Sequence, residues 1–164
     1  MRLILISAFA VFLSGCATQY KPNSFWNAGG FTETEIQPGL FQVRFNGNEL
    51  TSQSQTADFA MLRASDLCLA KGMKYMLMGE VDTRVVAGAL LPGSSTTTTN
   101  VTATAYGNTA YGTGTSYTST TPPTQLYRPQ SGLVLRCVPQ EGQSTWDAAF
   151  LSRSLRAKYK IESN

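Results

Sequence analysis

Histidine is absent from this chain of 164 residues. Without histidine, neither a Ser-His-Asp nor a Cys-His catalytic relay can form, and the commonest acid-base and metal-ligating side chain is missing. The chain also lacks a Walker-type phosphate loop, a dinucleotide-binding glycine fingerprint and the cysteine spacing of a zinc site. We therefore predict no catalytic residue, no metal ligand and no diffusible cofactor.

Charge is scarce as well. Charged residues make up 14% of the chain, against roughly 25% in ordinary soluble domains. The 13 basic and 10 acidic residues leave a net charge of +3, and no basic stripe is interleaved with aromatic residues, so no nucleic-acid partner is expected. Serine, threonine, glycine and asparagine take the place of the charged residues. The length suits one domain with a hydrophobic core.

Long apolar runs are also missing, and the longest one lies at the start of the chain. Residues 3–13, "LILISAFAVFL", follow Met1 and Arg2 and stop at two small residues. This run has the length of a secretory leader and is too short for the roughly 20 residues that span a bilayer. The run by itself is compatible with an ordinary secretory leader that happens to precede a cysteine, and with a short membrane helix.

Cysteine occurs three times, and the first cysteine closes this leader. Leu13-Ser14-Gly15-Cys16 resembles the lipobox of bacterial lipoproteins at all four positions. The resemblance implies cleavage between Gly15 and Cys16, a diacylglyceryl group on the Cys16 thiol and an acyl chain on the new amino terminus. Two or three acyl chains anchor a small domain firmly to a membrane. Ala17 is not the aspartate associated with retention in the inner membrane, so we predict the outer membrane, facing the periplasm.

The remaining chain predicts one domain over residues 29–162, joined to the anchor by a polar tether at 16–28. Phe41, Val43 and Phe45 alternate with polar residues, which is typical of a half-buried strand. Helical spacing follows over 57–72, then a strand from about 73 to 86 broken near Gly79, a strand near 132–138 and a terminal helix opened by Ser144 and Asp147. We predict an α+β two-layer sandwich of order ββαβ-loop-βα, with about four strands and two helices on one face.

Residues 92–123 differ from the rest in composition. They contain no charged residue and repeat the motif "TAYG". A structureless segment of this length inside a domain is either functional or a tolerated insertion, so we predict a long low-complexity loop. Threonine and tyrosine also permit a loosely paired hairpin. In the functional interpretation, Tyr106, Tyr111 and Tyr117 contact a partner, because tyrosines on a flexible polar background make adaptable contacts.

Cys68 and Cys137 remain once Cys16 is lipidated. Both fall on the expected interface between helix and sheet, and the periplasm is oxidising, which favours a disulfide. Two buried free thiols are the alternative.

For the acidic and basic residues, too, a functional role and an ordinary structural role are both open. Closely spaced carboxylates perform acid-base chemistry or bind Ca²⁺, but on an exposed strand they usually serve solubility. Cations in a terminal helix complement the helix dipole, or bind anionic headgroups or an acidic partner. The acidic pairs are Glu33 with Glu35 and Glu80 with Asp82; the helix cations are Arg153, Arg156, Lys158 and Lys160.

The block from Gly29 to Met78 resembles a family of small, uncharacterised proteobacterial envelope lipoproteins. Its matching residues are Gly30 to Thr34, Val43 to Phe45, Gly47-Asn48, Thr51-Ser52 and Ala57 to Ala64. A charged pair typical of the family before the helix is replaced by "QSQT". The resemblance implies an envelope lipoprotein and brings no catalytic residue with it.

Together these patterns predict a lipid-anchored cell-envelope protein that binds another envelope protein and has no catalytic role. The alternative is a membrane-anchored hydrolase or transferase that uses Asp and Glu residues, which requires carboxylates distant in sequence to converge in one cleft. A carrier of small apolar ligands would need a large apolar cavity.

Overall fold

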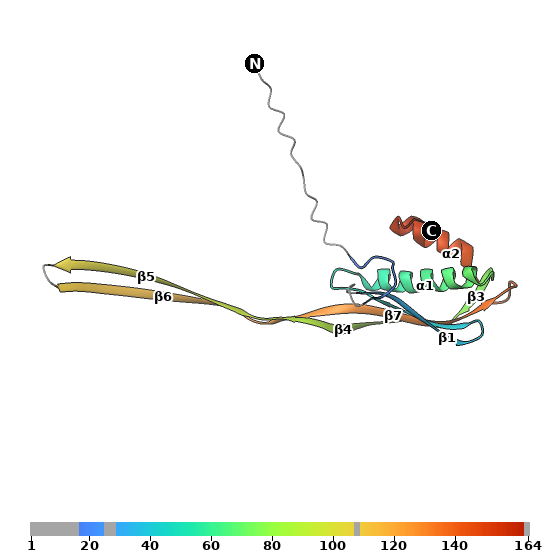
Figure 1. Ribbon diagram of the computed structural model, residues 1–164, viewed down its shortest axis with the longest axis horizontal. Coiled ribbons are helices and arrows are strands. Elements are labelled where there is room, and N and C mark those ends of the chain that lie inside the picture. Colours follow the sequence, from blue (N-terminus) through green and yellow to red (C-terminus); the bar gives the residue numbers. More distant parts are fainter. Residues whose placement is uncertain (1–16, 25–28, 107–108, 163–164) are drawn as a thin grey trace, which may run out of the picture. The chain divides into compact units, whose positions relative to one another are not determined.

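The computed structural model describes residues 17–24, 29–106 and 109–162. The chain forms two units, which we describe separately (Figure 1). Unit 1 comprises Met1–Val85 and Arg128–Asn164, and unit 2 comprises Val86–Tyr127.

A six-stranded sheet contains most of the strands, in the order β1-β2-β7-β3-β8, with β4 also paired to β7. β7 therefore lies at the centre of the sheet. It pairs antiparallel with both β2 and β3, so these two strands run parallel to each other on either side of it. The strands are β1 (Gly30–Gln37), β2 (Leu40–Asn46), β3 (Tyr75–Met78), β4 (Asp82–Leu91), β7 (Thr124–Val138) and β8 (Trp146–Asp147).

The strand expected over residues 73–86 is two strands, β3 and β4. The pairing of β3 with β7 ends at Met78, and β4 begins at Asp82. Gly79 lies at the break, where its N–H donates to the Val134 carbonyl at 2.8 Å.

The two helices begin and end at recognisable caps. In α1 (Gln53–Ala70), the Ser52 side chain accepts from the N–H of Gln55, and Gly72 follows the helix with φ of 73°. In α2 (Ala148–Tyr159), the Asp147 carboxylate accepts from the N–H of Phe150. Asp147 is therefore the cap, and Ser144 lies in the preceding loop with a positive φ.

The core lies between α1 and one face of the sheet. The predicted alternation in β2 is present: Phe41 and Val43 are buried and pair with Leu135 and Leu133 of β7. The α1 side of this core consists of Phe59, Ala60, Ala64 and Cys68. The intervening residues of β2 and β7 lie on the other face, which no helix covers.

α2 packs against α1 and makes little contact with the sheet. The Phe59 and Tyr159 rings meet edge to face at 4.9 Å, and Ser152 donates to Asp66 at 3.0 Å. The early part of α1 thus contacts the late part of α2, so the helices are antiparallel. The expectation that both helices lie directly on the sheet is wrong, because α1 is buried on two sides and presents its second side to α2.

Unit 2 contains an antiparallel two-stranded sheet where we expected a loop. β5 (Ser94–Tyr106) and β6 (Thr109–Thr121) have 13 residues each and pair along their whole length. Threonine and tyrosine favour strands, and hydroxyl pairs cross between the strands, as at Thr97 with Thr118 and Thr99 with Ser116. The part of the chain that the structure describes is therefore mostly β, with 50% strand and 22% helix, and the predicted four-stranded α+β sandwich is wrong.

Candidate functional site

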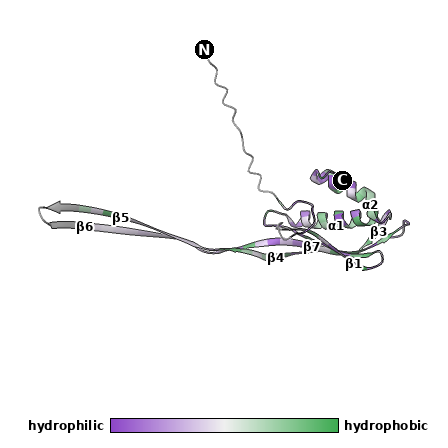
Figure 2. Cartoon of the chain, viewed as in Figure 1, coloured by the Kyte–Doolittle hydropathy of each residue, from purple (hydrophilic) through white to green (hydrophobic). Residues whose placement is uncertain are grey.

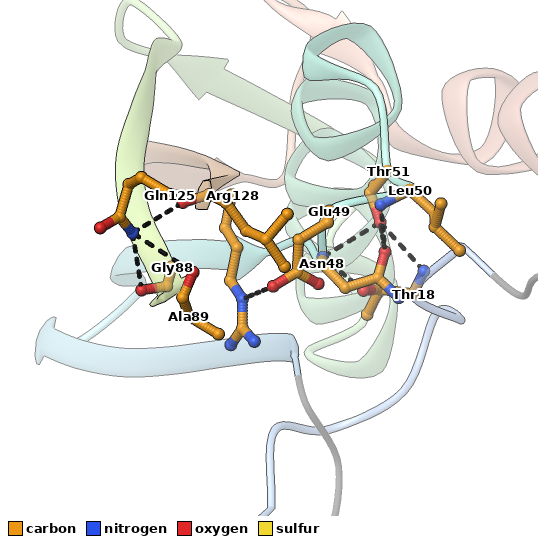
Figure 3. A network of polar contacts seen from close by, with 10 residues as sticks. Thr18, Asn48, Glu49, Leu50, Thr51, Gly88, Ala89, Gln125 and Arg128 are labelled. Atoms are coloured by element: carbon orange, nitrogen blue, oxygen red, sulfur yellow. Dashed lines mark hydrogen bonds and ion pairs between the residues drawn. The ribbon is translucent and has the colours of Figure 1, made fainter. Parts of the chain in front are cut away.

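The segment directly after the predicted lipidation site contacts the folded unit. Thr18 is 7% exposed. Its N–H donates to Thr51 Oγ1 at 3.0 Å, and its own Oγ1 accepts from the N–H of Asn48 at 2.8 Å (Figure 3). Both partners lie in the connection between β2 and α1. The residues expected to form the start of a tether are thus bound to unit 1 from Thr18 onward.

Tyr20 continues this contact into the core. Its ring packs against Phe31 at 5.0 Å and Phe59 at 5.7 Å, and its hydroxyl donates to Asp66 Oδ2 at 2.6 Å. Arg156 donates to the same oxygen at 2.7 Å. Burial, and then the neighbouring Asp66 carboxylate, raise the pKa of Tyr20 far above its ordinary value.

The raised pKa of Tyr20 makes stability fall at alkaline pH. A group whose pKa is higher in the folded state contributes stability below its unfolded pKa of about 10 and loses it as pH rises beyond that value. We expect the free energy of unfolding to fall above pH ~10, because the folded protein keeps one proton on Tyr20 that the unfolded chain releases. That proton adds to the slope of the free energy of unfolding against pH. Tyr20→Phe keeps the ring contacts and should remove that proton from the slope, measured by denaturant unfolding between neutral and alkaline pH. An unchanged slope in Tyr20→Phe contradicts the assignment.

A disulfide joins Cys68 in α1 to Cys137 in β7. The two Cα atoms are 5.2 Å apart, and both residues are buried in the core. The bond therefore ties the helix to the central strand of the sheet, and the alternative of two free thiols does not describe this structure.

The acidic residues of β1 form ion pairs with α1. Glu33 contacts Arg63 at 2.6 Å, and Glu35 contacts Lys71 at 3.0 Å. The N–H of Gly39, followed by Lys71, lowers the pKa of Glu35. These ion pairs attach the edge strand to the helix, which accounts for the two carboxylates without catalysis.

Two hollows in unit 1 gather polar side chains. The first, of about 240 Å³, lies on the uncovered sheet face and includes Glu80 and Asp82, the second predicted acidic pair, beside Arg44 and Arg84. Its two carboxylates come from neighbouring positions. The second hollow, of about 600 Å³, includes Glu33, Asp66 and Glu162, which are distant in sequence.

The second hollow meets the stated geometric requirement for a carboxylate enzyme, but two of its three carboxylates are held in ion pairs. Arg63 binds Glu33 and Arg156 binds Asp66, at 2.6 and 2.7 Å. Both carboxylates are thus engaged in ion pairs, and burial raises the pKa of the nearby Tyr20, which keeps it protonated. Within the described ranges no group of three or more His, Cys, Asp or Glu side chains is placed to hold a metal ion.

The ribbon formed by β5 and β6 carries the tyrosines predicted to contact a partner. Tyr117 is 75% exposed and pairs with Thr98. Tyr106 ends β5 and Tyr111 belongs to β6, but their side chains lie outside the part of the chain that the structure describes. Figure 2 shows mostly intermediate hydropathy along β5 and β6, in keeping with the absence of charge.

The polar network around Gly88 belongs to unit 2. The Gln125 side-chain amide donates to the Gly88 carbonyl at 3.1 Å and to the Leu126 carbonyl at 3.0 Å (Figure 3). The bond to Gly88 links β7 to β4, whereas the bond to Leu126 lies within β7. None of these residues was singled out from the sequence.

The residues that bind Thr18 and Tyr20 were not recognised as a site from the sequence either. Asn48 and Thr51 are among those that carry the family resemblance, and this was the only signal in the sequence. The predicted cleavage and lipidation site, Gly15 and Cys16, lies outside the described residues. The cations of the terminal helix lie where they were expected: Arg153 and Lys158 in α2, and Lys160 directly after it. Lys158 pairs with Asp58 at 2.6 Å.

Fold and site define a small disulfide-bonded β-rich domain with an attached amino-terminal segment and a long uncharged β-ribbon. Comparison with protein-family models, curated proteins and solved structures gave no match. The resemblance to envelope lipoproteins therefore stays a prediction. No helix in the described part of the chain is long and apolar enough to cross a membrane.

Proposed function

We propose that this protein is a lipid-anchored cell-envelope protein that binds another envelope protein through its β-ribbon and has no catalytic role. Acyl chains on Cys16 hold it at the outer membrane, facing the periplasm. The observation that carries the binding role is the ribbon of β5 and β6, which is paired over 13 residues per strand and contains no charged residue.

A ribbon of this kind is suited to strand addition. An isolated two-stranded sheet is only marginally stable in water, and its two outer edges present unpaired backbone N–H and C=O groups. Exposed edges are usually protected by lysine, proline or a bulge, and β5 and β6 contain none of these along their regular register. A partner strand that pairs with an edge would satisfy these groups, while Tyr117 and its neighbours on the same face add side-chain contacts.

The enzymatic alternative has less support. Glu33 and Asp66 are each bound to an arginine, and the other hollow holds carboxylates from only one short segment, Glu80 and Asp82.

Deletion of residues 94–121 tests the proposal. The deletion leaves Pro92, Gly93, Pro122 and Pro123 between β4 and β7, which is an ordinary length for a hairpin connection. In vivo crosslinking and affinity capture should recover a partner with the intact protein and lose it with the deletion variant. An intact Cys68–Cys137 disulfide in the variant, measured by mass after alkylation, shows that unit 1 is folded.

A point variant refines the same test. Tyr117→Ala removes an exposed tyrosine from the ribbon, and Tyr127→Ala removes an exposed tyrosine outside β5 and β6. We expect roughly tenfold weaker capture for Tyr117→Ala, since an aromatic contact contributes about 1.4 kcal/mol or more, and unchanged capture for Tyr127→Ala. An unchanged partner list after deletion would make the ribbon a tolerated insertion and contradict the proposed binding role.

A further inference from the structure

We propose that the anchor holds one particular end of unit 1 against the bilayer, so that the protein has a fixed membrane-facing surface. This surface consists of the β2–α1 connection at residues 47–52, the segment at Thr18 and Gln19, and the carboxyl end of α2. The inference rests on the proposed lipidation of Cys16. Its partner is an anionic lipid surface.

The first step is the length of chain available between lipid and domain. Consecutive Cα atoms are about 3.8 Å apart, so the Cα of Cys16 lies within about 7.6 Å of the Cα of Thr18. Thr18 is buried and bound through its N–H and its hydroxyl. Ala17 is thus the only residue between the acylated cysteine and a bound residue. A flexible linker of many residues, which would let the domain rotate freely, is absent from this stretch.

The second step is the rigidity of the surface that binds Thr18. Thr51 Oγ1, which accepts from Thr18, itself donates to Asn48 Oδ1 at 2.7 Å. The same Asn48 oxygen accepts from the N–H of Leu50 at 3.1 Å. This loop leads directly into the amino-terminal cap of α1 at Ser52 (Figure 3). The attachment point is therefore continuous with the longest helix of unit 1.

The third step is the chemistry of that surface. Leu50 is 62% exposed at the tip of the loop, where an aliphatic side chain can enter the boundary between headgroups and acyl chains. A hollow beside Thr18 is lined in part by Lys160, which follows α2. No ion pair of Lys160 is present in the part of the chain that the structure describes, whereas Lys158 and Arg156 are paired. The ammonium group of Lys160 complements anionic headgroups.

The opposite end of unit 1 provides an internal reference. α1 has 18 residues and is about 27 Å long. Because α2 runs antiparallel to α1, the loop at residues 139–145 lies near the carboxyl end of α1, and the N–H of Ala148 donates to the Lys74 carbonyl there. A probe in that loop should be well separated from the headgroups when the proposed surface faces the bilayer.

Site-specific fluorescence quenching tests this orientation. A fluorophore is attached to Gln53→Cys, at the start of α1, or to Gln143→Cys, in the distal loop; both positions are exposed. The full-length lipidated variants are reconstituted into vesicles of phosphatidylethanolamine and phosphatidylglycerol that carry a spin-labelled headgroup. We expect strong quenching at position 53 and near-background quenching at position 143. A matched variant with a linker of about ten Gly and Ser residues inserted after Cys16 should lose the difference, since such a linker reaches about 18 Å.

The outcomes separate this inference from the proposed function. Palmitate incorporation and flotation with vesicles are measured on the same samples and report the anchor alone. If the protein is lipidated and floats but both positions are quenched equally, the fixed orientation is overturned and the anchor stands. If quenching at position 53 persists with the inserted linker, the short connection is not its cause, and the inference is overturned as well. If palmitate is not incorporated, both proposals fail.

Discussion

Replacing Cys68 and Cys137 together with alanine is expected to lower the free energy of unfolding by about 4 kcal/mol. The two residues are separated by 69 positions, and a bond that closes a loop of this length restricts the unfolded chain strongly in the chain-entropy model. The last turn of α1, all of β3, β4 and the ribbon, and nearly all of β7 lie within this loop. Denaturant unfolding of the purified protein in oxidising buffer measures the loss.

Reduction of the unmodified protein serves as the control. A thiol reductant should lower its unfolding midpoint nearly to that of Cys68→Ala/Cys137→Ala, and should leave the double variant itself unchanged. The small difference that remains reports the packing of the two sulfur atoms, which alanine removes. If the reductant left the midpoint of the unmodified protein in place, the disulfide would contribute no stability and the expected loss would be wrong.

The elements around the core were predictable from the sequence because their side-chain periods are clear. Phe41, Val43 and Phe45 alternate and are buried, and the apolar spacing over residues 57–72 predicts α1 together with its end at Gly72. The helical spacing of the apolar residues does not show, however, that α1 is buried on two sides. That burial depends on α2, which packs against α1 from another part of the chain.

The ribbon could not be recognised in the same way. Its strands contain threonine, serine and glycine on both faces, so no alternation of apolar and polar residues marks a strand. Register in β5 and β6 comes from cross-strand pairs such as Thr97 with Thr118, which are visible only once the strands are aligned. Low complexity and the absence of charge favour a loop, and only the threonine and tyrosine content permits the hairpin alternative.

The contacts of the amino-terminal segment were hidden for a different reason. Tyr20 meets Asp66 across 46 positions, and Thr18 meets Thr51 across 33. Both segments are polar and short, so their local sequence is typical of a linker. Only the tertiary structure shows that the chain is bound to unit 1 immediately after the predicted lipidation site, and the proposed orientation at the membrane rests on this contact.

The replacement Cys16→Ser is expected to abolish incorporation of radiolabelled palmitate. The Cys16 thiol is the proposed acceptor of the diacylglyceryl group, and a hydroxyl does not replace it in that transfer. Cleavage after Gly15 depends on the same modification, so the variant should also keep its leader and have a higher mass. Each buried methylene contributes about 0.8 kcal/mol to membrane binding, so loss of two or three acyl chains removes the strongest interaction that the proposed anchor makes.

Cys68→Ala/Cys137→Ala provides the matched control for this experiment. In the unmodified protein these cysteines are joined to each other and have no free thiol for an acyl chain, so the double variant should incorporate as much palmitate as the unmodified protein. Fractionation alone is not decisive, because an uncleaved leader can still bind a membrane, whereas palmitate counts acyl chains directly. Undiminished labelling of Cys16→Ser would contradict the lipoprotein assignment. Because Thr18 is bound to unit 1 only two residues later, it would also remove the reason for a fixed membrane-facing surface.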